Sequence, residues 1–182
     1  FLKQGSNKNI ESNLKLLWRQ FKFLKLMYCV YPVGLKKATI LYSVFLLSIV
    51  FDLPVKNKKK ILKKLAQTLM SCVDLDGQIV SRSPEDFLGF FIIIIEILNF
   101  NGKENLINNN ELQLLLGLKK TMAPILRGLR LGDGSLTRTH GGDVGSIGII
   151  DRYLVNSKVK DPPAITNILG FERITAGRLV LI

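Results

Sequence analysis

Apolar residues recur at helical spacing along most of the chain. Six of them between Leu14 and Tyr28 share one face of a predicted helix, and lysine and arginine side chains occupy the opposite face. Pro32 and Gly34 end this helix, because proline lacks a backbone donor and glycine readily leaves the helical conformation. Residues 1–9 are polar, and we expect them to be frayed.

Two further helices are predicted before the middle of the chain. Residues 35–51 are apolar on nearly every side, as in a helix packed on both faces, and a break follows at 52–54. Residues 57–73 place leucines inward and lysines outward. Cys29 and Cys72 occupy apolar positions without metal-ligand spacing, so we expect both to be buried free thiols.

Capping residues indicate two more helices. Ser83, followed by Pro84 and two acidic residues, favours a helix start, and the apolar run behind it extends to about residue 99. The pair Asn101-Gly102 predicts a turn. Asn108, with an acidic residue three positions later, begins a helix to about residue 129 that Pro124 should kink.

The chain then becomes rich in glycine. Residues 131–148 hold six glycines and the only histidine, and neither a helical nor a strand period fits them. This loop is either a plain helix-to-sheet connection or a polar site at the mouth of a helical scaffold. A short helix over 147–155, a rigid linker at 161–163 and a hairpin over 170–182, turning at Ala176-Gly177, complete the prediction. No tight internal sequence repeat is visible.

Length and composition narrow the class of protein. A chain of 182 residues with 47% apolar residues can form one domain with a core and is not disordered. The apolar runs 38–51 and 87–100 are shorter than the ~20 residues of a membrane span, so we predict buried helices and no transmembrane segment. Because the chain starts at Phe1 and stops within an apolar run, we expect it to be a piece of a longer protein.

The net charge of +12 suits nucleic acid, an anionic membrane or an acidic substrate. The lysines cluster only over residues 56–64, without zinc-finger spacing, a ribonucleoprotein motif or interleaved aromatic residues. We therefore expect no nucleic-acid partner. An acidic polysaccharide is compatible with such a diffuse positive surface, and so is the absence of any charged ligand.

Three sequence blocks resemble one family. Asp76-Gly-Gln-Ile-Val-Ser-Arg-Ser-Pro, Arg130-Leu-Gly-Asp-Gly-Ser-Leu and Gly170-Phe-Glu-Arg-Ile-Thr-Ala-Gly-Arg-Leu-Val-Leu-Ile occur in this order. They resemble blocks of the bacterial heparinase II/III-like proteins, in their proteobacterial branch, and the spacing between them also fits. With the helices before them, the resemblance covers nearly all of the chain.

The resemblance implies a mainly α fold. Antiparallel helix pairs of an incomplete (α/α) toroid, over residues 1–160, would precede the first strands of a truncated antiparallel β-sandwich, over residues 161–182. It also implies a lyase that cleaves uronate-containing polysaccharides by β-elimination in the cell envelope. In that reaction the uronate carboxylate is neutralised, a base removes the neighbouring proton and an acid protonates the leaving oxygen.

Candidate residues follow from the motifs. His140 occupies the position of an asparagine in the relatives, and it would neutralise the carboxylate or act as base; Tyr153 is the candidate proton donor. The candidate substrate contacts are Arg82, which can hold a carboxylate bidentately, and Arg138. Asp133 and Asp143 either orient His140 or form turns with their glycines. Ser81 and Ser83 are expected to be backbone caps.

Other functions stay open. Heparinases place an aromatic residue and a histidine shortly after the Ser-Arg-Ser-Pro block, where this chain has Glu85, Asp86 and Phe87. This departure favours a second class, a non-catalytic glycan-binding or cell-envelope protein on the same scaffold. A third possibility is an inactive, truncated gene product. No phosphate-loop or calcium-loop pattern is complete, so we expect neither a metal ion nor a cofactor.

Overall fold

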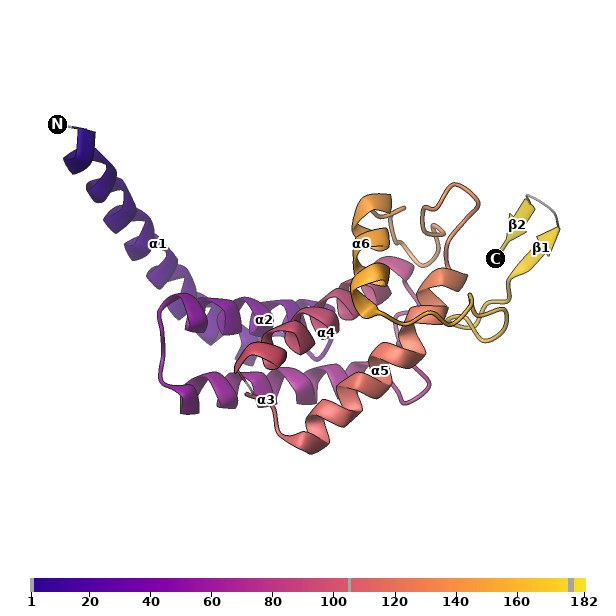
Figure 1. The fold of residues 1–182 in the computed structure, drawn as a ribbon, viewed down its shortest axis with the longest axis horizontal. Coiled ribbons are helices and arrows are strands. Elements are labelled where there is room, and N and C mark those ends of the chain that lie inside the picture. The colour runs from indigo at the N-terminus through magenta and orange to yellow at the C-terminus, as the bar shows by residue number, and fades with distance from the viewer. Residues whose placement is uncertain (1, 105, 177–178) are drawn as a thin grey trace.

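The computed structural model describes residues 2–104, 106–176 and 179–182, and it is mainly helical (Figure 1). The described part holds six helices followed by one small antiparallel sheet. In chain order the elements are α1 (Leu2–Val30), α2 (Leu35–Val50), α3 (Val55–Cys72), α4 (Pro84–Glu104), α5 (Asn109–Gly128), α6 (Ile147–Ser157), β1 (Ile174–Ala176) and β2 (Leu179–Leu181). None of the helices described is long and apolar enough to cross a membrane.

Helix α1 extends away from the other helices at its N-terminal end (Figure 1). The predicted fraying is wrong for residues 2–9, because the helix already begins at Leu2, and residue 1 lies outside the described residues. Its apolar face is only partly covered: Phe21 is buried, whereas Leu14 and Trp18 are 43% and 37% exposed. Cys29 is exposed, contrary to the prediction, because α1 packs chiefly against α2 and leaves its other sides to solvent.

Helices α2 and α4 form the centre of the molecule. Helix α2 packs against α1, α3 and α4, and α4 packs against α2, α5 and α6. Burial of each large apolar side chain contributes about 1.5–3 kcal/mol relative to its exposure. Because both helices bury large apolar side chains in the core, the prediction of two buried apolar helices is confirmed. The largest side chains that these two helices bury completely are Leu41, Phe45, Phe87, Phe91, Ile94, Ile95 and Ile97.

Helix α4 is longer than its sequence pattern predicts. The turn expected at Asn101-Gly102 is wrong, since the helix continues to Glu104. Phe100 packs edge-on against Phe45 of α2, with ring centroids 5.7 Å apart. This contact holds the last turns of α4 on the core, where packing outweighs the turn preference of the Asn-Gly pair.

Two predicted helix caps are present. The side chain of Asn108 accepts a hydrogen bond of 2.8 Å from the backbone N–H of Glu111 at the start of α5. The hydroxyl of Ser83 accepts a longer one, 3.4 Å, from the backbone N–H of Asp86 at the start of α4.

The same tight turn follows α3 and α5. It spans residues 74–78 and residues 131–135, and in both cases the first backbone N–H donates to the carbonyl of the last residue, at 3.0 and 2.8 Å. Gly77 and Gly134 close the two turns with φ of +79° and +88°, which residues with a Cβ rarely adopt. The turns share an Asp-Gly pair and a following triplet, Ser81-Arg82-Ser83 or Thr137-Arg138-Thr139. The sequence prediction missed this short repeat because backbone geometry, not side-chain pattern, defines most of it.

The segment after α6 returns along α5. The backbone N–H of Ala164 donates to the carbonyl of Pro124 at 2.9 Å, and Arg127 donates to the carbonyl of Asp161 at 2.9 Å. Gly128 makes this approach possible, since a Cβ there would lie 2.7 Å from the carbonyl oxygen of Ala164. These bonds fix the predicted linker against the helical core.

Strands β1 and β2 form the predicted hairpin, with Ala176 opposite Leu179. The turn expected at Ala176-Gly177 includes Gly177, which lies outside the described residues. Arg173, just before β1, donates to the carbonyl of Gly128 at 2.7 Å and to that of Arg130. The hairpin is thereby tied to the end of α5.

Candidate functional site

Three loops from separate parts of the chain meet at one surface, which we call the loop face: residues 80–83, 137–143 and 167–171. The guanidinium of Arg82 lies against Gly170, where a Cβ would be 3.4 Å from Nη1. The ring of His140 lies beside that of Phe171, with centroids 5.6 Å apart. Arg82 and His140 are exposed and Phe171 is half-buried. The fold thus brings together two predicted site residues that are 58 positions apart in sequence.

A tight turn presents His140. The carbonyl of Thr139 accepts a hydrogen bond of 3.0 Å from the N–H of Gly142, and the central residues His140 and Gly141 have φ of +51° and +76°. Positive φ at both central positions defines a type I′ turn. Within the described part of the chain the imidazole makes no hydrogen bond, and the residue is exposed.

Backbone strain gathers at the same surface. Among the described residues, six that are not glycine have positive φ, and four of these, Arg82, His140, Asn167 and Leu169, belong to the loop face. Such conformations cost of order 1–3 kcal/mol each and are concentrated at binding and catalytic sites. The sequence pattern does not predict these backbone conformations.

Gln78 clamps the third loop in place. Its side-chain amide donates to the carbonyl of Asn167 at 2.7 Å, and its side-chain oxygen accepts from the N–H of Leu169 at 2.9 Å. A groove of about 420 Å³ runs between this clamp, the end of α3 and Arg82. Gln78 therefore positions the loop against which Arg82 rests.

The arginines of the C-terminal half have two different environments. Arg127, Arg130 and Arg173 donate to backbone carbonyls and hold loops to α5. Arg82 and Arg138, the predicted substrate contacts, are exposed, and their side chains form no hydrogen bond or ion pair within the residues described. Their guanidinium groups remain available to an anion.

The two aspartates of the glycine loop stabilise turns. Asp133 accepts hydrogen bonds from the hydroxyl and the backbone N–H of Ser135, at 2.6 and 2.9 Å, and these bonds lower the pKa of its carboxyl. Asp143 accepts a bond of 2.7 Å from the N–H of Val144, and its own N–H donates to Glu85 at 3.1 Å. Neither carboxylate bonds to His140.

Tyr153 lies in a different environment from His140. Its hydroxyl donates to Glu96 of α4 at 2.6 Å, and burial, with this hydrogen bond, raises its pKa to about 12. The His140 loop instead contacts the start of α4 through Glu85. Glu96 lies eleven positions after Glu85 on α4, which is about 16 Å along a helix. The two candidate proton-transfer groups are thus anchored at different points of α4.

Two hydroxyls of the glycine loop lack partners. Thr137 Oγ1 and Thr139 Oγ1 are buried and form no hydrogen bond in the described part of the chain. An unsatisfied buried hydroxyl costs about 1–3 kcal/mol. They flank Arg138, and Thr139 immediately precedes His140.

The sequence analysis missed two residues that shape the loop face. Gln78 lies inside the Asp-Gly turn, where its type gives no indication of the clamp 89 positions away. Phe171 belongs to the predicted hairpin segment, and aromatic residues are common in strands. The roles of Gln78 and Phe171 become apparent only from their contacts with the other loops.

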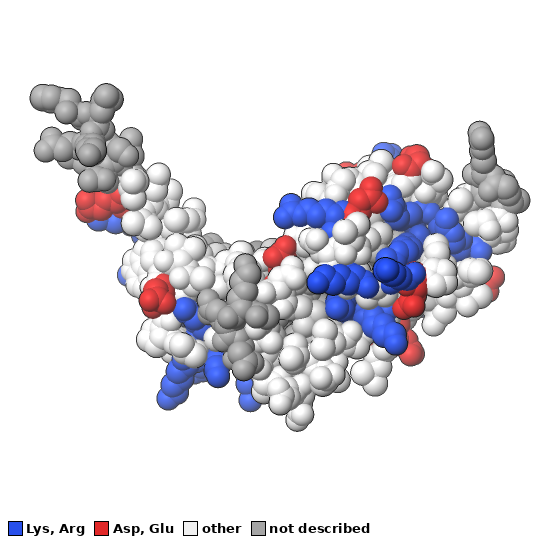
Figure 2. Space-filling model, in the orientation of Figure 1, with Lys and Arg blue, Asp and Glu red and all other residues white. Residues whose placement is uncertain are grey.

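A separate basic surface covers the end of the molecule around α6. Figure 2 shows Lys and Arg gathered there, and a shallow groove is lined by Arg127, Arg130, Lys158 and Lys160. Arg130 is paired with Asp151 at 2.7 Å, which reduces the charge available to a ligand. Across the described residues, no group of three His, Cys, Asp or Glu side chains is placed to hold a metal ion.

Comparison of the chain with protein-family models, with curated proteins and with solved structures finds no match. The heparinase II/III-like resemblance is therefore a hypothesis drawn from three sequence blocks. The geometry of the loop face supplies the remaining basis for a functional proposal.

Proposed function

We propose that this chain is part of a heparinase II/III-like protein and that its loop face binds a uronate-containing polysaccharide. In this proposal the helices belong to an (α/α) toroid, β1 and β2 begin an antiparallel β-sandwich, and the protein acts in the bacterial cell envelope. The observation that carries the proposal is the grouping of Arg82, His140 and Phe171 on one accessible surface.

Each of the three side chains suits one part of an acidic sugar. A guanidinium holds a carboxylate through two parallel hydrogen bonds. The imidazole adds a donor, and a positive charge when it is protonated. The face of an aromatic ring carries negative potential and attracts the C–H edge of a sugar ring. The strained backbone of Arg82 and His140 supports the same interpretation, because strain is retained where function requires it.

Binding is tested by calorimetric titration with oligogalacturonate. Arg82→Gln should weaken binding about ten- to a hundredfold, since a charge-assisted bidentate contact contributes on the order of 1.5–3 kcal/mol. Arg152→Gln is the matched control: Arg152 is exposed, lies on α6 outside the loop face, and its loss changes the net charge equally. Equal losses in the two variants would mean diffuse attraction to a cationic chain and would contradict a site at the loop face.

Catalysis by β-elimination is the second candidate, favoured by the exposed and unbonded imidazole of His140. Its product has a new carbon–carbon double bond, which is followed by ultraviolet absorbance. His140→Asn separates the two possible roles of the histidine. If it neutralises the carboxylate, asparagine preserves the absorbance change; if it is the base, asparagine abolishes it. No absorbance change in the unmodified protein, with glycan binding retained, would leave a binding protein on this scaffold.

A further inference from the structure

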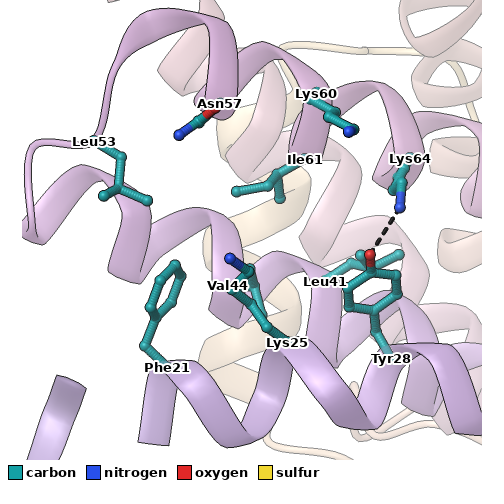
Figure 3. A pocket seen from close by; sticks show the side chains of 10 residues that line it. All are labelled: Phe21, Lys25, Tyr28, Leu41, Val44, Leu53, Asn57, Lys60, Ile61 and Lys64. Carbon is teal, nitrogen blue, oxygen red and sulfur yellow. Dashed lines mark hydrogen bonds between the residues drawn. The ribbon is translucent and has the colours of Figure 1, made fainter. Parts of the chain in front are cut away.

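A pocket of about 220 Å³ lies between α1, α2 and α3, and it is formed by other elements than the loop face (Figure 3). Its inner wall is apolar. Phe21 is 2% exposed, and Leu41 and Val44 are 1% exposed each. Leu53 and Ile61 extend this wall toward the opening. An apolar chain entering here would leave water and meet aliphatic side chains.

Three lysines and an asparagine surround the opening of the pocket. Lys25 comes from α1, and Lys60, Lys64 and Asn57 come from α3 (Figure 3). No acidic residue is among the residues that line it. The nearby Asp52 is paired with Lys58 at 3.1 Å, so it does not neutralise these three.

The lysines are held in place to different degrees. The ammonium of Lys64 donates to the hydroxyl of Tyr28 at 2.7 Å and lies 4.7 Å from the centre of its ring. That of Lys25 lies 5.3 Å from the centre of the Phe21 ring. Lys60 is exposed and forms no hydrogen bond or ion pair among the described residues. Two ammonium groups are thus ordered against aromatic faces, and a third is free to close on a ligand.

We infer that this pocket binds a medium-chain aliphatic carboxylate, with the tail against Leu41 and Val44 and the carboxylate among Lys25, Lys60 and Lys64. The three ammonium groups determine the sign of the head group, and the aliphatic wall determines the nature of the tail. The volume lies below the ~300–1,000 Å³ of sites for drug-sized molecules, which excludes a long-chain ligand and favours a medium chain. This site is independent of the proposed glycan site.

Sodium octanoate is the probe, used below its micellar concentration. Trp18, the only tryptophan in the chain, stacks on Phe21 of the pocket at 5.3 Å between centroids, so its fluorescence reports binding. Octanoate should give a saturable change. Shorter carboxylates should bind up to about fourfold more weakly for each methylene removed, because a buried methylene contributes about 0.8 kcal/mol.

Head-group controls test the charge requirement. 1-Octanol and octylammonium should bind at least tenfold more weakly than octanoate, since one lacks the charge and the other carries the opposite sign. Equal binding of either compound would contradict the inference. So would saturable binding to anionic lipid vesicles with no response to octanoate, which would indicate a membrane surface instead.

A pair of variants locates the site. Lys60→Gln should weaken octanoate binding about two- to fivefold, the effect of one exposed ion pair. Lys59→Gln removes the same charge from an exposed neighbour on α3 that does not line the pocket, and it should leave binding unchanged. Both side chains are exposed, so both variants should fold. Equal effects of the two substitutions, or no saturable signal in the unmodified chain, would overturn the inference.

Discussion

The two parts of the chain that meet after α3 differ sharply in charge. Residues 1–72 carry 14 Lys and Arg and 2 acidic residues, whereas residues 73–182 carry 12 basic and 12 acidic residues. The whole net charge of +12 therefore belongs to α1–α3, and the part that contains the loop face is neutral. The positive charge is concentrated in residues 1–72, whereas the loop face belongs to residues 73–182.

The basic residues themselves also differ. Of the 14 in the first part 13 are lysines, whereas 7 of the 12 in the second part are arginines. The lysines mostly project into solvent from helices, while Arg127, Arg130 and Arg173 bond to backbone carbonyls. Arginine presents a fixed fork of donors and lysine a mobile point charge. Net charge is thus a poor guide to the specific site of this chain.

Loops pack so closely against α5 that a single added methyl group should change the stability of the neutral part. Gly128→Ala should lower the free energy of unfolding by about 1–3 kcal/mol, because its Cβ would meet the carbonyl oxygen of Ala164. Gly117→Ala on the same helix meets open space and should raise it by about 0.5–1 kcal/mol. Denaturant unfolding measures both, and effects of the same sign would contradict this packing.

Tyr42, Glu96 and Tyr153 form a polar junction between the two parts, and it should make stability depend on pH above 10. Burial and the carboxylate of Glu96 raise the pKa of Tyr42 on α2 and of Tyr153 on α6 to about 12, from 10.0. These hydroxyls keep their protons in the folded chain at a pH where the unfolded chain loses them. Stability should therefore fall as the pH rises from 10 toward 12.

Tyrosinate absorbance measures this junction directly. Two of the four tyrosines should ionise late in the folded protein, and Tyr153→Phe should remove one of them. Tyr31→Phe is the control and should leave the late transitions intact. The absence of any tyrosine that ionises near pH 12 would show that burial and Glu96 do not raise the pKa of Tyr42 and Tyr153.

The positive φ of His140 should lower the stability of the fold, and the imidazole should contribute to glycan binding. His140→Gly should raise the free energy of unfolding by up to about 1 kcal/mol, because glycine adopts positive φ without steric cost. The same substitution should weaken oligogalacturonate binding, since the imidazole is lost. A variant that is more stable and binds equally well would remove His140 from the proposed site.

The lysines of α3 should contribute least to stability. Replacing exposed Lys56, Lys59 and Lys63 by Gln should change the free energy of unfolding by no more than about 0.5 kcal/mol. It should also reduce salt-sensitive binding of any polyanion, since exposed charges are screened. A large loss of stability would mean that these side chains have structural partners, unlike Lys58, whose pairing with Asp52 is already apparent.

Periodicity predicted the helices because burial of one apolar face determines them. The capping residue Asn108 and the hairpin of β1 and β2 were also predicted correctly, since short-range hydrogen bonds and β-propensity act locally. The last turns of α4 were not, because the contact of Phe45 with Phe100 joins distant parts of the chain.

The candidate site was predicted residue by residue but not as an arrangement. Arg82 and His140 were identified from motifs, yet their common surface depends on Gln78 and on backbone strain that no pattern encodes. Tyr153 was chosen for its closeness in sequence to the glycine loop. Its bond to Glu96 depends on how α6 packs on α4.

Hydrogen–deuterium exchange with and without oligogalacturonate tests most directly whether the neutral loop face, and not the lysine-rich helices, binds the glycan. We predict slower exchange in peptides that cover residues 80–83, 137–143 and 167–171, with α3 unchanged at physiological salt. Protection confined to α3, with the three loops unaffected, would contradict the account and assign glycan binding to the lysine-coated helices.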